Sequence, residues 1–205
     1  MVWLEVECKV KLEDSQIKDL RKRIEKIAKY KKGGVKKDDY FAIQEKGYPK
    51  KAFRIRQMGD ELEVCFKKWK TKLWYPNALN PKVVVKQEFE FTLKGKDEAE
   101  DILELFEDFG FKEWVKKIKK NETYSYNKNK KLSIELNHVK NLGWFMEMEY
   151  LCQEPESKKA INLILSVLKE LNIDLNQIDN TGYTKMLWYK GTVGKEKFID
   201  KETAL

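Results

Sequence analysis

Charged side chains of the same sign recur two residues apart in this sequence. In a β-strand such residues lie on one face, where like charges repel, and a face that only meets water has no reason to collect them. Carboxylates bind hard cations such as Mg²⁺ and Mn²⁺, whereas Arg and Lys bind phosphate oxygens. The pairs therefore indicate a site for a metal ion and a polyanion. They are Glu5 with Glu7, Glu88 with Glu90, Glu147 with Glu149, and Arg54 with Arg56.

Around these pairs, polar and apolar residues alternate, which is the pattern of half-buried β-strands. For any one strand, the alternation also fits an ordinary antiparallel sheet with one face in water. The like-charged pairs favour a charged interior instead. We predict strands over Leu4–Lys11, Ala52–Gln57, Glu61–Lys67, Val83–Thr92, Trp114–Tyr124, Leu132–Val139 and Phe145–Leu151.

Other segments have apolar residues three or four apart, as amphipathic helices do. We predict helices over Ser15–Tyr30, Asp97–Phe109 and Ser157–Leu171, and a shorter one near Tyr183–Tyr189. Lys70–Pro81, with a proline at Pro76 and another at its end, is predicted to be a loop.

The order of these elements contains a weak internal repeat. A Glu-x-Glu pair precedes a helix twice, first at Glu5 and Glu7 and again at Glu88 and Glu90, and strands follow each helix. Two β-α-β-β halves that close into one antiparallel barrel would explain the repeat. We expect one domain over residues 1–190 and a charged, loosely held tail over residues 191–205.

Composition limits the class of protein. The chain has 205 residues, a net charge of +8 and 41% hydrophobic residues, which suffices for a core. No apolar run is long enough to cross a membrane, and the first residues have no secretory signal pattern. The three cysteines are widely spaced and form neither a disulfide framework nor a zinc motif, so we expect a reducing, cytoplasmic setting.

Several other site chemistries lack the residues that they need. His138 is the only histidine, which excludes a His-based triad or zinc site and favours a structural or surface role. Gly33 and Gly34 lack the spacing of a phosphate-binding loop. Cys65 is expected to pack inertly, because no histidine accompanies it to make it a nucleophile.

The ordered set of charged motifs resembles the signature of the CYTH superfamily, the triphosphate tunnel metalloenzymes. The similarity begins with Glu-x-Glu-x-Lys at Glu5–Lys9 and extends to about Leu187. Its further motifs are Asp38–Phe41, Phe53–Arg56, Val64–Lys67, Gln87–Glu90 and Leu142–Glu149. The resemblance implies an α+β fold: a closed antiparallel eight-stranded β-barrel with a hydrophilic tunnel and with helices packed outside.

The resemblance also implies roles for individual residues, with Mg²⁺ or Mn²⁺ as the cofactor. The implied catalytic residues are Glu5, Glu7, Lys9, Glu147 and Glu149. The implied metal ligands are Glu5, Glu7, Glu147 and Glu149, together with Glu88 and Glu90. The implied phosphate-binding residues are Lys9, Arg54, Arg56, Lys67 and Lys119.

Two positions depart from the family pattern. Asn137 stands where the family usually has Asp, and Asn121 stands where it tends to have Arg. Glu135, two residues before Asn137 on the same strand face, is the nearest residue that could restore the negative charge, so we include it among the expected metal ligands. An ordinary salt-bridged role for Glu135 is the alternative. Lys119 and Lys120 are the residues that could compensate for Asn121.

The resulting hypothesis is a metal-dependent enzyme acting on a nucleoside triphosphate, inorganic tripolyphosphate or thiamine triphosphate. Hydrolysis is slightly favoured, because cyclisation of ATP by a class IV adenylyl cyclase also needs a pocket for adenine. A non-catalytic binder of polyphosphate or RNA is a further alternative, although such a binder gains nothing from the glutamates. We expect a triphosphate-containing small molecule as the partner, no membrane, no nucleic acid, and a monomer or homodimer.

Overall fold

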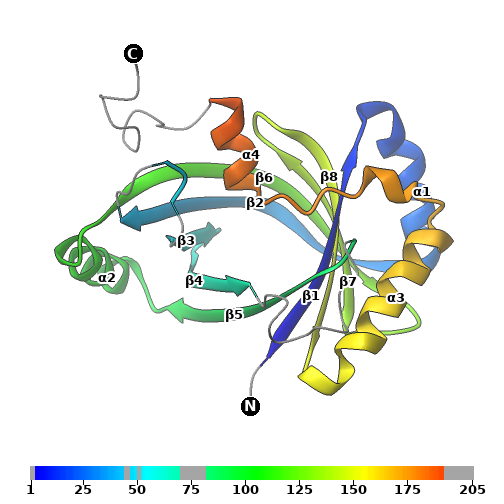
Figure 1. Cartoon of the computed structure of the whole chain (residues 1–205), viewed down its shortest axis with the longest axis horizontal. Coiled ribbons are helices and arrows are strands. Elements are labelled where there is room, and N and C mark those ends of the chain that lie inside the picture. Colours follow the sequence, from blue (N-terminus) through cyan, green and yellow to red (C-terminus); the bar gives the residue numbers. More distant parts are fainter. Residues whose placement is uncertain (1–2, 44–46, 50–51, 70–81, 192–205) are drawn as a thin grey trace.

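Eight antiparallel strands form a closed barrel (Figure 1). The computed structural model describes residues 3–43, 47–49, 52–69 and 82–191, with residues 67–69 described by their backbone alone. The strands are β1 (Leu4–Leu12), β2 (Ala28–Ile43), β3 (Ala52–Met58), β4 (Glu61–Trp69), β5 (Val84–Leu93), β6 (Phe111–Tyr126), β7 (Leu132–Val139) and β8 (Gly143–Cys152). Around the barrel they follow the order β1-β5-β4-β3-β2-β6-β7-β8. The predicted fold is confirmed.

Four helices pack outside the barrel (Figure 1). They are α1 (Ile17–Ile27), α2 (Lys96–Asp108), α3 (Ser157–Glu170) and α4 (Tyr183–Lys190), and single 3₁₀ turns occupy η1 (Asp14–Gln16), η2 (Glu154–Glu156) and η3 (Leu175–Gln177). The predicted loop over Lys70–Pro81 and nearly all of the predicted tail lie outside the described residues.

The first predicted helix was too long at its C-terminal end. Helix α1 ends at Ile27, and the next three residues, predicted as helix, begin the 16-residue strand β2. Ala28 already has an extended backbone (φ −140°, ψ 149°), and it pairs with Tyr126 of β6. The start of β2 has no alternation of polar and apolar residues. It is a strand because β2 pairs with β6 along nearly the whole length of β2.

The internal repeat is real in the topology, but each half has one more strand than predicted. The halves are β1-α1-β2-β3-β4 and β5-α2-β6-β7-β8. If each strand of one half is exchanged with the corresponding strand of the other half, the order of strands around the barrel stays the same. Four strand pairs join the two halves: β1 with β5, β4 with β5, β2 with β6, and β1 with β8.

The largest hydrophobic core lies between the barrel wall and the helices α1 and α3. Val6, Cys8 and Val10 of β1 are fully buried in it, together with Ile24 of α1 and Ile164 of α3. Each buried aliphatic side chain of this size contributes about 1.5–3 kcal/mol to stability. Because the apolar face of β1 points outward under the helices, its charged face points into the barrel.

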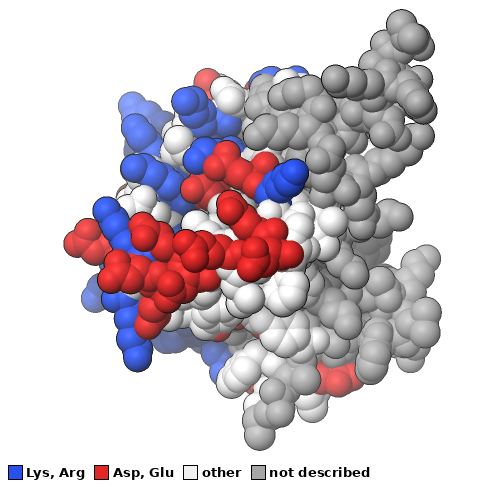
Figure 2. Space-filling view, turned by 90° about the vertical axis from the view of Figure 1, so that its left-hand side faces the viewer, with Lys and Arg blue, Asp and Glu red and all other residues white. Residues whose placement is uncertain are grey.

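The outer surface is unevenly charged. Figure 2 shows a band of acidic side chains on the face that carries α2. Seven of the 13 residues of α2 are acidic, in a chain whose net charge is +8. No helix in the described part of the chain is long and apolar enough to span a membrane.

Candidate active site

One cavity of about 1040 Å³ occupies the interior of the barrel, and we call it the tunnel. With the exception of Lys67, every residue that the sequence predicted for the site lines it. These residues are Glu5, Glu7, Lys9, Arg54, Arg56, Glu88, Glu90, Lys119, Glu135, Glu147 and Glu149. Lys67 belongs to β4 and pairs with Glu88, but its side chain lies outside the described part.

Five glutamates form an acidic wall on three neighbouring strands, β1, β8 and β7. Oxygens of Glu5, Glu7 and Glu149 lie within 4.8 Å of one another, and so do oxygens of Glu135, Glu147 and Glu149. Register explains the grouping, because Glu7 faces Glu149 and Glu135 faces Glu147 across adjacent strands. Glu149 therefore belongs to both groups and joins them.

The Lys119 ammonium lies between two of these glutamates. Its Nζ is 3.1 Å from Oε2 of Glu135 and 3.2 Å from Oε2 of Glu147, and all three side chains are buried. Burial alone would raise the pKa of Glu147, but the positive charges of Lys119, Lys9 and Lys117 together lower that pKa to about 2. Lys36 adds a second ion pair to Glu135 at 2.9 Å. Lysines of β6 and β2 thus keep Glu135 and Glu147 ionised.

Two further lysines approach the wall from other directions. Lys86 Nζ lies 2.5 Å from Oε1 of Glu7. Lys9 Nζ donates to the backbone oxygen of Thr181 and lies 4.2 Å from the centre of the Tyr183 ring. Burial lowers the pKa of Lys9 to about 8, against the opposing effect of the nearby glutamates.

Basic residues of β2, β3 and β6 form the adjacent wall, which we call the basic wall. Asp38 is completely buried there and accepts two hydrogen bonds from Arg56, at 2.7 and 3.0 Å, and an ion pair from Lys117 at 2.8 Å. Burial opposes ionisation of Asp38, but these cations hold its pKa well below the usual range. Arg54 contacts Glu63 at 2.9 Å and Glu90 at 3.4 Å.

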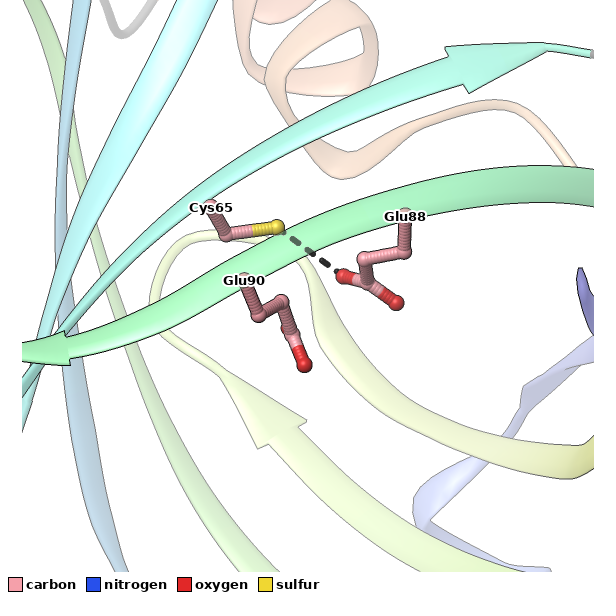
Figure 3. Close-up of side chains that lie close together, drawn as sticks. All are labelled: Cys65, Glu88 and Glu90. Atoms are coloured by element: carbon pink, nitrogen blue, oxygen red, sulfur yellow. Dashed lines mark hydrogen bonds between the residues drawn. The ribbon is translucent and has the colours of Figure 1, made fainter. Parts of the chain in front are cut away.

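Glu88 and Glu90 do not join the acidic wall. They form a separate group with Cys65, whose thiol donates to Oε1 of Glu88 at 2.9 Å (Figure 3). Burial and the neighbouring Glu88 raise the pKa of Glu90 to about 7. The structure therefore splits the predicted metal ligands into a set of five and a set of two.

A family model for the CYTH domain matches residues 4–183. The chain belongs to the CYTH domain family. Members of this family act on triphosphate compounds, the substrate class that the motifs imply. A comparison with curated proteins gave no match.

Solved structures share the fold of this CYTH domain. The protein PH1012 of Pyrococcus horikoshii OT3 is 24% identical with a TM-score of 0.68, over 88% of this chain and 98% of that chain. HpAC1 of Hippeastrum, an adenylyl cyclase candidate that reveals a dominant triphosphatase activity, is 16% identical (TM-score 0.61; 92% and 96% covered). The Mimivirus capping enzyme triphosphatase is 12% identical (TM-score 0.50; 82% and 89% covered).

The two departures from the CYTH pattern lie opposite each other. Asn121 of β6 and Asn137 of β7 are direct cross-strand partners. A site with Arg and Asp at these positions would contain one positive and one negative charge, so replacing both by Asn leaves the net charge of the tunnel unchanged. Asn137 now donates to Glu147 at 2.7 Å and to Glu135 at 3.3 Å. Relative to the family pattern, the site therefore lacks one acid and also one base, and the lost base offsets the charge of the acid lost at Asn137.

Of the two proposed compensating lysines, only one faces the tunnel. Lys119 is buried against the acidic wall, whereas Lys120 is exposed on the other face of β6. Glu135 combines the two roles considered for it, because it is ion-paired and also belongs to a group that could hold a metal ion.

Among the described residues, seven charged ones outside the predicted set also line the tunnel: Lys36, Glu63, Lys86, Lys117, Lys130, Lys131 and Lys185. Lys36 and Lys86 have no like-charged partner two residues away on the same strand face, so no repeated pair marks them. Lys117 does have such a partner in Lys119, and this pair could have been found from the sequence. Asp38, the buried partner of Arg56 and Lys117, belongs to the Asp38–Phe41 motif, but the motif alone predicts no role for it. For β2, recognising the strand over its full length would have shown that Lys36 and Asp38 share a face with Tyr40.

The donor set of the acidic wall fits a hard divalent cation. All five side chains are carboxylates, and each group of three brings its oxygens within 4.8 Å. Oxygens on opposite sides of a Mg²⁺ ion are about 4.2 Å apart, so small side-chain shifts suffice. Glu5, Glu7 and Glu149 would hold one ion. Glu149 also belongs to the second possible metal site, which it forms with Glu135 and Glu147.

Replacing Lys119 by Met should destabilise the protein in a pH-dependent way. Removing one partner of a buried ion pair costs about 3–5 kcal/mol, so we expect that loss in the free energy of unfolding at neutral pH. In the wild type, the lowered pKa of Glu147 stabilises the fold above the ordinary glutamate pKa, and this contribution disappears as the pH falls toward about 2. In the variant, burial raises that pKa, so protonation at mildly acidic pH relieves the unpaired charge.

Urea unfolding near neutral pH and near about pH 5 measures the effect. The difference in the free energy of unfolding between wild type and Lys119→Met should be smaller at the lower pH. Lys120→Met, on the exposed face of the same strand, is the matched control and should change stability little. A penalty of equal size at both pH values would show that Lys119 does not hold the glutamates ionised.

Proposed function

We propose that this CYTH protein hydrolyses a triphosphate compound with the help of a divalent metal ion. The observation that carries the proposal is the adjacency of the acidic and basic walls inside one buried cavity. The first wall suits a hard cation and the second suits phosphate oxygens. A compound that needs both at once is a metal-bound polyphosphate.

In this proposal, the lysines of the tunnel pair with glutamates when substrate is absent and with phosphates when it is bound. Without substrate, Lys119 and Lys36 neutralise Glu135 and Glu147. With substrate, the metal ion would neutralise the glutamates, and the released ammonium groups would neutralise the phosphates. Since both exchanges replace one ion pair by another, no charge is left uncompensated in the buried site.

Each wall has a distinct task in hydrolysis. The glutamates would hold a metal ion, which would supply a polarised water and would neutralise charge on the phosphates. Arg54, with Lys117 and Lys119, would orient the phosphate chain and stabilise the charge that develops on the leaving group. Lys9, which is buried in the tunnel beside the acidic wall, would add a further positive charge for the phosphates.

The decisive experiment incubates the protein with ATP, tripolyphosphate and thiamine triphosphate, each with Mg²⁺ or Mn²⁺, and analyses the products. Hydrolysis predicts phosphate as the product, and removal of metal by a chelator should abolish its formation. Cyclic AMP with pyrophosphate would instead identify a class IV adenylyl cyclase. Binding without turnover and without metal dependence would overturn the enzyme assignment in favour of a polyanion binder.

Glu149→Gln should weaken the metal site, because Glu149 is the ligand common to both groups of carboxylates. We expect the metal concentration for half-maximal activity to rise by at least about 10-fold. Glu104→Gln, an exposed acid on α2, is the control and should leave that concentration unchanged. Equal metal dependence in wild type and Glu149→Gln would contradict the assignment of Glu149.

Arg54→Lys should weaken use of the substrate although it keeps the charge. Nε of Arg54 is buried and has no hydrogen-bond partner among the described residues, so it can donate to a phosphate. Lys lacks the planar fork, and the loss of one charge-assisted bond should lower kcat/KM by about 10- to 150-fold. The comparison is Arg21→Lys, outside the tunnel, where kcat/KM should not change. Unchanged kcat/KM in Arg54→Lys would place the phosphates elsewhere.

A further inference from the structure

A β-bulge in β6 turns an aromatic side chain into the tunnel. Tyr40 of β2 pairs with Val115 and Phe41 pairs with Glu113, which leaves Trp114 without a partner in the ladder. Trp114 and Val115 are consecutive and yet both buried, so the alternation of β6 is broken at this point. Bulges of this kind re-aim side chains next to active sites, and Trp114 lines the tunnel.

The ring of Trp114 is fixed by neighbours from two other segments. Tyr48 meets it edge-on, with ring centroids 5.1 Å apart and an interplanar angle of 81°. Tyr48 in turn contacts Trp188 of α4 at 5.9 Å, and its hydroxyl lies 2.8 Å from Oγ1 of Thr184. Tyr48 also lines the tunnel. We call Tyr48 and Trp114 the aromatic wall, a rigid surface with flat rings.

This aromatic wall lies close to the phosphate-binding arginine. Ala52, which lines the tunnel and packs in the same hydrophobic cluster as Trp114, is two residues before Arg54 on the same face of β3. That spacing corresponds to about 6.5–7 Å along the strand.

The chemistry of the tunnel is thus divided between ionic and aromatic surfaces. Inorganic tripolyphosphate has no apolar surface, so flat rings add nothing to its binding. The volume of about 1040 Å³ is at the upper end of the range of about 300–1,000 Å³ found for pockets that hold organic ligands. A ligand that uses the whole tunnel has a polyphosphate chain and a planar ring.

We propose that Tyr48 and Trp114 bind the planar ring of an organic triphosphate whose phosphate chain lies on Arg54. This inference rests on the proposed function and narrows its substrate class to ring-bearing triphosphates. The ring is a nucleobase or the heterocycle of thiamine, which share the chemistry that an aromatic surface recognises.

The test compares kcat/KM for ATP, thiamine triphosphate and tripolyphosphate in wild type, Trp114→Leu and Tyr48→Leu. Wild type should prefer one ring-bearing compound, which identifies the ring. The ratio of its kcat/KM to that of tripolyphosphate should fall by about 5- to 150-fold in the variants. Trp144→Leu is the matched control, because Trp144 lies outside the tunnel beside His138, and it should keep the wild-type ratio.

Each other outcome is also decisive. An unchanged ratio in both variants, or no preference of the wild type for either organic compound over tripolyphosphate, overturns the inference and leaves the proposed hydrolysis intact. If Trp114→Leu fails to fold, the half-buried Tyr48 still tests the aromatic wall. If no compound is turned over, the proposed function fails instead, and calorimetric binding of the same compounds to the same variants decides the inference.

Discussion

This structure depends on one constraint, which is that each buried charge in the barrel has a partner of opposite charge. The Lys119 ammonium between Glu135 and Glu147 is an example. A barrel with charged side chains inside must neutralise each charge locally, because an unpaired buried charge costs several kcal/mol. The same rule explains Asp38 between Arg56 and Lys117, and Lys86 beside Glu7. In the proposed function, these ion pairs stand in for the metal ion and the phosphates.

Filling the barrel with charges also determines what lies outside it. The apolar face of each strand must be covered from the outer side, and α1 and α3 do so over β1 and β8. Helix α4 covers the part of β2 and β6 that carries the bulge at Trp114. The helices are therefore part of what positions the tunnel residues, although most of their side chains never reach the cavity.

Sequence reasoning succeeded where chemistry repeats along one strand. The pairs Glu5–Glu7 and Glu147–Glu149 identified the acidic wall because strand alternation alone places each pair on one face. It failed where the answer depends on which strands are neighbours. The register of the strands must be known before one can see that Glu88 is separate from the acidic wall. The same holds for the pairing of Asn121 with Asn137. Strand β2 was underestimated because its N-terminal half has no alternation and depends on β6.

In the proposed function, the metal ion and the triphosphate together replace the internal ion pairs of the tunnel. The direct measurement is the midpoint of thermal unfolding with Mg²⁺ alone, with a methylene-bridged triphosphate that is not hydrolysed, and with both. The account predicts that both together raise the midpoint by more than the sum of the separate increases, because each ligand releases the partner of the other. Increases that merely add, or a triphosphate effect that is independent of Mg²⁺, would contradict it.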